Sequence, residues 1–283
     1  MRLGVVLRGT GAHAAAGVGA LCELSRRRIE PYAVCGMDAG AWPAALHIAG
    51  YDAKRLEGAL AQAARMGGRL LVPSASARAL LRGDKSALCG GAHMQRLLVA
   101  QAGERMLALC PRRGIFLCRA ARGGHGVIFA TQAYAQEPGD IVTTQASVSF
   151  AARAAMARPP FLAPVPWMGA PLLAQRDTAF ACRQLLAMGA QRVLVIAPVP
   201  SPRRAPDALE LVELGERCWE ESLPQRTGVL RVTMPEDAGA LSFGKLAACA
   251  EAGRRAAEAE LDRVFERMGM AFCRVLPFRR ANG

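Results

Sequence analysis

The stretch Val34-Cys35-Gly36-Met37-Asp38-Ala39-Gly40-Ala41 decides how this chain folds. Its apolar beginning predicts a short buried strand over residues 32–37, and an apolar helix over 41–49 follows and ends at Gly50. Between strand and helix, two glycines flank one polar residue. Because glycine has no side chain, strand and helix can pass close together at such a turn, and the central residue stands exposed at the helix N-terminus. The stretch therefore predicts a tight turn that presents Asp38.

The rest of the chain repeats this order of strand and helix. Residues 3–7 predict a buried strand that runs into a small-residue loop and a helix, as 32–49 do. Further strands are predicted at 105–109, 114–118, 127–130, 192–197 and 230–234, and helices within 52–101 and at 147–157, 180–188 and 243–268. Repeated alternation favours an α/β fold, a mostly parallel central sheet with helices on both faces. We expect one domain over 1–283, with a helical insertion at about 52–101.

The charge of the chain limits its partners. Net charge is +13 over 283 residues, which raises nucleic acid or an anionic membrane surface as a partner. The basic residues are almost all arginine and are spread along the chain, and three Tyr and three Trp leave little for base stacking. Nucleic-acid binding is therefore the weaker interpretation. The run Arg26-Arg27-Arg28 is typical of a solvated helix end.

Cysteine and histidine usage predicts neither a metal site nor a cofactor. The nine cysteines include no Cys-x-x-Cys pair, and the four histidines are scattered. Most cysteines lie in apolar runs, where a free thiol behaves as a small buried hydrophobe. The chain opens directly on a strand and has no uncharged apolar run of membrane-spanning length. We expect a reduced, cytoplasmic protein that can lie against a membrane surface.

Several segments, taken in order along nearly the whole chain, resemble the patatin-like phospholipases. The residues that carry the resemblance are Gly9-Thr10-Gly11-Ala12-His13-Ala14, Gly36 to Ala41, Ala152-Arg153-Ala154-Ala155 with Pro159-Pro160, and Met168-Gly169-Ala170. The family consists of serine acyl hydrolases with a Ser–Asp dyad on a three-layer α/β fold. The resemblance implies an oxyanion loop at Gly9, Thr10, Gly11 and Ala12, a nucleophile elbow flanked by Gly36 and Gly40, and a second dyad position at Met168.

The sequence departs from the family pattern at the positions that carry the family's catalytic chemistry. Asp38 stands where the family has its serine, and Met168 where it has its aspartate. In the loop, Thr10 replaces a glycine and His13 an arginine. A dyad needs an exposed hydroxyl, a carboxylate that takes its proton, and donors for the oxyanion. Without hydroxyl and carboxylate we expect a catalytically degenerate acyl-hydrolase homologue that binds an acyl lipid, an anionic membrane surface or a protein partner.

Two other functions stay open at this stage. A working hydrolase could use Asp38 as the nucleophile and His13 as the base, and a basic anion- or nucleic-acid-associated module would use the arginines. The plainer interpretations are that Asp38 caps the helix beginning near Ala41 and that Met168 fills a former polar pocket. Ser147 and Ser149 lack an elbow and are expected to cap a helix.

Overall fold

A computed structural model describes residues 1–83, 86–135, 139–214 and 222–270. Within them the strands are β1 (Leu3–Leu7), β2 (Ala33–Gly36), β3 (Gly114–Ala120), β4 (Gly126–Ala130), β5 (Ile141–Thr143), β6 (Val165–Trp167), β7 (Ala170–Ala174), β8 (Arg192–Val199) and β9 (Thr227–Thr233). They join in one sheet with the order β5-β4-β3-β2-β1-β8-β9, and the β6–β7 hairpin pairs with β3 through β7. The five strands from β3 to β9 along that order run parallel.

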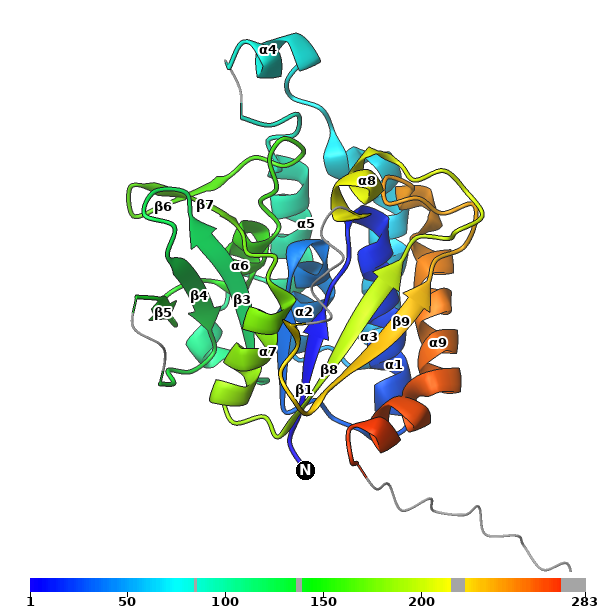
Figure 1. The fold of residues 1–283 in the computed structure, drawn as a ribbon. Coiled ribbons are helices and arrows are strands. Elements are labelled where there is room, and N and C mark those ends of the chain that lie inside the picture. The colour runs from blue at the N-terminus through cyan, green and yellow to red at the C-terminus, as the bar shows by residue number, and fades with distance from the viewer. Residues whose placement is uncertain (84–85, 136–138, 215–221, 271–283) are drawn as a thin grey trace, which may run out of the picture.

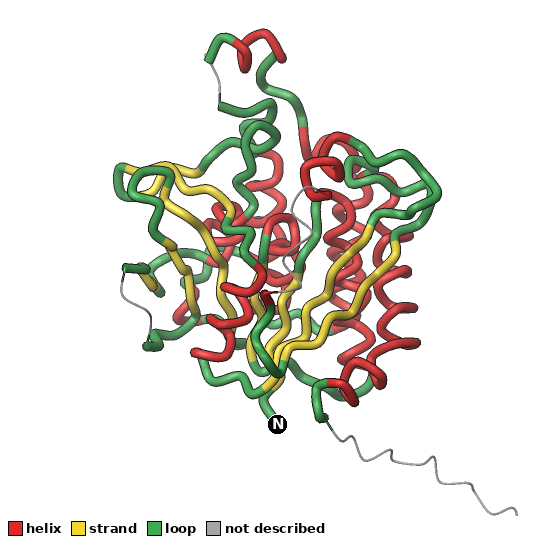
Figure 2. Tube along the Cα trace, viewed as in Figure 1, coloured by secondary structure: helices red, strands yellow, loops and turns green. Residues whose placement is uncertain are grey.

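Helices cover both faces of the sheet (Figure 1; Figure 2). The α-helices are α1 (Ala15–Arg26), α2 (Ala41–Ile48), α3 (Ala53–Met66), α4 (Ala77–Leu81), α5 (Ala92–Ala102), α6 (Val148–Ala155), α7 (Thr178–Ala187), α8 (Ala208–Leu214) and α9 (Leu246–Arg267). Short 3₁₀ turns are η1 (Gly11–Ala14), η2 (Asp38–Gly40), η3 (Gly67–Leu71), η4 (Leu107–Leu109) and η6 (Phe243–Lys245).

Two apolar cores show why the sheet has this layering. In β1 the side chains of Val5 and Leu7 join a large core built with α1, α2, α3, α5, α6 and α9. Val6, between them, points to the other face and packs with Cys35 and Cys182 against α7. Successive residues of a strand point to opposite faces, so a strand buried on both sides must be apolar throughout. The three-layer α/β fold predicted from the sequence is confirmed.

Most predicted elements are found within a few residues, and the differences have simple causes. The strand predicted at 105–109 is wrong: this segment ends in the 3₁₀ turn η4, with Leu107 buried and Leu109 exposed. A short apolar run does not distinguish a strand from a helical turn. The capping role of Ser147 is confirmed, because its hydroxyl accepts a hydrogen bond from the Phe150 amide at 3.2 Å. The strands β5, β6 and β7 were not predicted.

The described helices include none with the length and apolar character needed to cross a bilayer. The described cysteines are free thiols, and burial raises the pKa of Cys35 and Cys118. Two cysteines predicted to be reduced, Cys218 and Cys273, lie outside the described residues. The run at residues 26–28 ends α1 as expected, and Arg26 and Arg27 both bind the buried carboxylate of Glu23.

Candidate functional site

Two loops meet at the carboxyl edge of the sheet, where β1 and β2 end side by side. The strands are parallel, with Leu7 opposite Gly36, and the Met37 amide donates to the Leu7 carbonyl at 3.1 Å. The next strand on the other side of β1 is β8, so the chain changes direction across the sheet at β1. Ligands of open α/β sheets bind at such a switch point. The loops after β1 and β2 therefore define the place to look for a site.

The glycines of the elbow are required by close backbone contacts. A Cβ atom on Gly40 would lie 2.1 Å from the Leu7 carbonyl oxygen, and one on Gly36 would lie 2.6 Å from the Ala41 Cα. Both distances are far below ordinary van der Waals contact, and the obstructing atoms are backbone that cannot swing aside. The strand–turn–helix unit thus has the tight form that the sequence pattern indicates.

Asp38 stands at the corner of this turn. Its φ of +51° is in the left-handed region, which aspartate tolerates better than most residues. The helix-cap interpretation is wrong, because the N-cap of α2 is Gly40 and Asp38 begins the preceding turn η2. Its Oδ2 instead accepts a hydrogen bond from the Arg158 Nη1 at 2.7 Å. The side chain is 15 % exposed, so this is a partly buried ion pair.

Arg158 connects the elbow to the loop after β1. The same Nη1 atom donates to the Thr10 hydroxyl at 3.1 Å. The guanidinium is buried, and its Nε and Nη2 atoms have no hydrogen-bond partner. Sequence reasoning missed this residue because it lies 120 positions from Asp38. The available signal was a lone arginine between the apolar helix α6 and Pro159-Pro160.

The loop after β1, which was expected to bind an oxyanion, makes several contacts with other parts of the protein. The Ala12 amide donates to the Ala240 carbonyl at 2.7 Å. His13 is buried, and its Nε2 lies 3.0 Å from the Ala238 carbonyl oxygen and 3.3 Å from the Glu210 Oε1. These contacts tie η1 to α8 and to the segment before η6. The structure thus places His13 in a buried polar contact and not among the residues that line the cavities beside Asp38.

Met168 does not fill a pocket. It is 85 % exposed and forms the turn between β6 and β7 together with Gly169. Both residues have positive φ, +45° and +77°, which is the backbone of a two-residue type I′ hairpin turn. The segment instead approaches the elbow after β7, where Arg176 lines a small cavity with Asp38 and Arg8. The space-filling interpretation of Met168 is therefore wrong.

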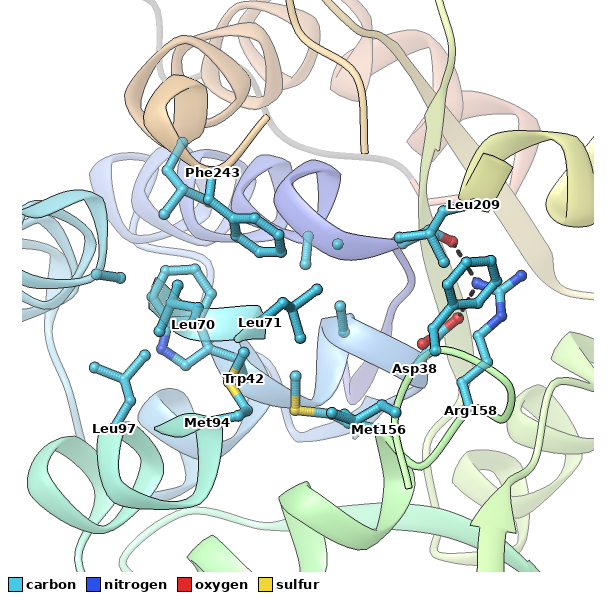
Figure 3. Close-up of a pocket in the computed structure, with 18 residues that line it drawn as sticks. Asp38, Trp42, Leu70, Leu71, Met94, Leu97, Met156, Arg158, Leu209 and Phe243 are labelled. Carbon is cyan, nitrogen blue, oxygen red and sulfur yellow. Dashed lines mark hydrogen bonds and ion pairs between the residues drawn. The ribbon is translucent and has the colours of Figure 1, made fainter. Parts of the chain in front are cut away.

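An apolar pocket opens beside the elbow (Figure 3). Asp38 and Arg158 lie at one end, and Trp42 and Leu97 lie toward the other. The pocket has a cavity volume of about 60 Å³, within about 650 Å³ of space between the side chains that includes the part open to solvent. The apolar side chains of the lining come from η1, η2, α2, α3, η3, α5, the segment after α6, α8, η6 and the start of α9: Ala14, Ala39, Trp42, Ala63, Leu70, Leu71, Met94, Leu97, Met156, Phe161, Leu162, Leu209, Phe243 and Leu246.

The polar atoms near the apolar end are already paired. The Trp42 indole donates to the Gln101 Oε1 at 2.7 Å, and the Gln101 Nε2 donates to the Ala59 carbonyl at 2.9 Å. The pocket therefore offers an apolar surface that ends at one ion pair. Among the residues that the structure describes, no three His, Cys, Asp or Glu side chains come close enough together to hold a metal ion.

The fold belongs by its architecture to the patatin-like α/β class. The crystal structure of VipD from Legionella pneumophila matches with a TM-score of 0.52 and 11 % identity, covering 93 % of this chain and 67 % of that one. ExoU, in its complex with SpcU from the type III secretion system of Pseudomonas aeruginosa, matches with a TM-score of 0.39 and 14 % identity, covering 95 % and 53 %.

No family sequence model matches the chain, and no curated protein matches it in sequence. The chain spans about two thirds of VipD and about half of ExoU. At such low identity the likeness concerns the fold, and the function has to be argued from the site itself.

Proposed function

We propose that this protein binds the acyl chain of a lipid in the pocket beside Asp38 and does not hydrolyse it by serine–aspartate chemistry. The observation that carries the proposal is the apolar pocket that ends at the Asp38–Arg158 ion pair. Ligand sites are typically concave and mostly apolar, with a few polar groups that fix the orientation of the ligand. An apolar chain with a polar head matches this distribution.

The pocket lining suits a flexible chain. Met94 and Met156 both line the pocket (Figure 3), and methionine adapts to irregular shapes because it is unbranched. The cavity admits the end of a chain, and a longer chain would extend along the part open to solvent. Each methylene removed from water contributes about 0.8 kcal/mol, which is about a fourfold gain in affinity.

The contacts of Arg158 argue against the hydrolysis that the fold class suggests. Attack by a nucleophile needs a free lone pair at the elbow and donors aimed at the developing oxyanion. Here one guanidinium nitrogen binds both the Asp38 carboxylate and the Thr10 hydroxyl. The ion pair thus ties the elbow to the loop after β1. His13, the base of the alternative mechanism, is held by Ala238 and Glu210.

The test is displacement of a fluorescent fatty acid by unlabelled fatty acids of increasing length, below their micellar concentrations. We expect affinity to rise about fourfold per methylene until the chain outgrows the pocket. Met94→Trp, which fills the cavity, should abolish the binding. Arg96→Trp adds the same side chain at an exposed position of α5 and should leave it unchanged. Affinity that does not depend on chain length, or that Met94→Trp leaves intact, would refute the proposal.

A hydrolysis assay tests the remaining alternative, an active hydrolase that uses Asp38 as its nucleophile. The protein should release no acid from p-nitrophenyl butyrate or from a phospholipid above the buffer rate. Release that Asp38→Asn abolishes, together with an acyl adduct on Asp38 in mass spectra, would establish the active hydrolase instead.

A further inference from the structure

An arm with exposed apolar and basic side chains leads from the pocket to the outside of the molecule. We define the arm as residues 67–83, from η3 through α4 to Gly83. It projects beyond the body of the molecule at the end where α8 also lies (Figure 1). Leu70 and Leu71 at its base line the apolar pocket, while Leu81 near its tip is 89 % exposed. The arm is therefore continuous with the pocket wall.

The charge of the arm has one sign. Residues 67–83 contain three arginines and no acidic residue, and a fourth arginine, Arg65, lies just before them at the end of α3. Among them, Arg65, Arg69 and Arg82 are exposed, and none of the three forms an ion pair with a described carboxylate. By contrast, the exposed arginines of α9, Arg254 and Arg255, are paired with Glu251 on the same helix. The arm thus keeps positive charge of the kind that Glu251 neutralises on α9.

Further apolar side chains are exposed beside the pocket. Leu211 on α8 and Leu241 before η6 are each about half exposed, and each lies two residues from a side chain of the pocket lining, Leu209 and Phe243. Val72 in the arm is exposed as well. Leucines surrounded by arginines at one end of a molecule form a surface of the interfacial type, in which apolar groups enter a bilayer and cations bind anionic headgroups.

We infer that the arm, with Leu211 and Leu241, docks on an anionic phospholipid bilayer and that the pocket opens toward it. The occupant is argued from charge complementarity: arginines that no described carboxylate neutralises favour an anionic partner, and the exposed leucines favour one with an apolar interior. This inference extends the proposed function, because the bilayer would be the source of the acyl chain, but docking is measured without reference to the pocket.

The test is co-sedimentation with vesicles of phosphatidylcholine alone and of phosphatidylcholine containing one third phosphatidylglycerol. The native protein should bind the anionic vesicles and lose that binding at high salt. Arg69→Gln with Arg82→Gln should weaken binding by about 25-fold, since each arginine near an anionic surface contributes about fivefold. Leu81→Ser should weaken it by about tenfold.

Matched controls change the same residue types at the opposite end of the molecule. Arg28→Gln with Arg226→Gln removes two exposed charges, just after α1 and just before β9, that no described carboxylate pairs with, and Leu109→Ser removes a leucine that is 70 % exposed. Both should bind as the native protein does. Docking is refuted if the native protein does not bind anionic vesicles, which is expected of an arm that binds a protein. It is also refuted if the arm variants and the control variants bind equally, which is expected of a nonspecific basic surface.

Failure of docking and failure of lipid binding give different patterns. Met94→Trp should lose the fluorescent fatty acid and keep vesicle binding, and Leu81→Ser should do the reverse. If the native protein binds vesicles but no fatty acid, docking stands and the proposed function falls. If it binds fatty acid but no vesicles, the proposed function stands and docking falls.

Discussion

The Arg158 Nη1 atom lies 2.7 Å from the Asp38 Oδ2 atom, although 120 residues separate the two in sequence. The pair joins the turn after β2 to the segment that follows α6, and the contact to Thr10 adds the loop after β1. Three segments of the carboxyl edge of the sheet are thus held together by one guanidinium. The ion pair with Arg158 explains how the Asp38 carboxylate can lie at the end of an otherwise apolar pocket.

The first prediction concerns the stability that this pair provides. Removing one member of a buried ion pair leaves an uncompensated charge and costs roughly 3–5 kcal/mol. Because Asp38 is 15 % exposed and water screens part of the loss, we expect Asp38→Asn to lower the free energy of unfolding by about 2–3 kcal/mol. Asparagine tolerates the positive φ, so the loss would report the charge and not backbone strain. Urea unfolding measures it.

A double-mutant cycle provides the control. Arg158→Met should be destabilising as well, and the double change Asp38→Asn with Arg158→Met should cost less than the sum of the single changes. Additive losses would show that the two side chains do not stabilise each other.

The second prediction concerns an attempt to rebuild the hydrolase. The resemblance implies that Asp38→Ser with Met168→Asp restores a dyad, whereas the structure places residue 168 in an exposed hairpin turn. Asp38→Ser would also leave the Arg158 guanidinium without its carboxylate partner. We therefore expect the double variant to hydrolyse p-nitrophenyl butyrate no faster than buffer. Turnover above that rate would mean that residue 168 reaches the elbow.

The sequence predicted the core of the fold because its strongest signals are local. The strand of residues 3–7 and the turn around Asp38 were found because buried apolar runs and glycine-flanked turns follow from neighbouring residues. The hairpin of β6 and β7 was missed because its strands are short and contain prolines. The role of Met168 was predicted wrongly for a related reason. Gly169 belongs to a type I′ turn, but in the sequence it resembles the glycine that follows the family's aspartate.

The partners of the site could not be predicted, because they depend on tertiary contacts. Nothing in the residues around Asp38 points to Arg158, and nothing around His13 points to Glu210 on α8. The apolar pocket likewise collects side chains from segments spread from η1 to α9. Long-range pairing of this kind is fixed by the packing of the layers and not by local spacing.

The third prediction concerns pH and a buried histidine outside the pocket. His47 is buried in α2, with its Nδ1 3.4 Å from the Arg112 Nη1, and burial together with that cation lowers the pKa of His47 to about 3. In the unfolded chain the pKa is about 6.5. Between these values the unfolded state binds a proton that the folded state does not, so stability falls as pH falls, by about 1.4 kcal/mol per pH unit.

The measurement is the free energy of unfolding in urea at pH values from 7 down to 5. We expect His47→Gln, which does not titrate, to lose much less stability over this interval, with a difference of about 2 kcal/mol. Parallel curves for the native protein and the variant would show that His47 gains a proton without cost in the folded state.

The last prediction concerns the close approach at the elbow. Gly40 has an ordinary helical φ of −60°, so an alanine there is strained only by contact: its Cβ would lie 2.1 Å from the Leu7 carbonyl oxygen. Relief requires the whole turn to move away from β1, and we expect Gly40→Ala to lower the free energy of unfolding by about 3 kcal/mol. The movement would carry Asp38 with it, so fatty-acid binding should weaken as well. Gly58→Ala is the matched control, because this exposed glycine inside α3 has open space around it and alanine there should stabilise the helix by about 0.5–1 kcal/mol. Unfolding curves that shift in the same direction for both variants would mean that Gly40 is not in close contact with β1.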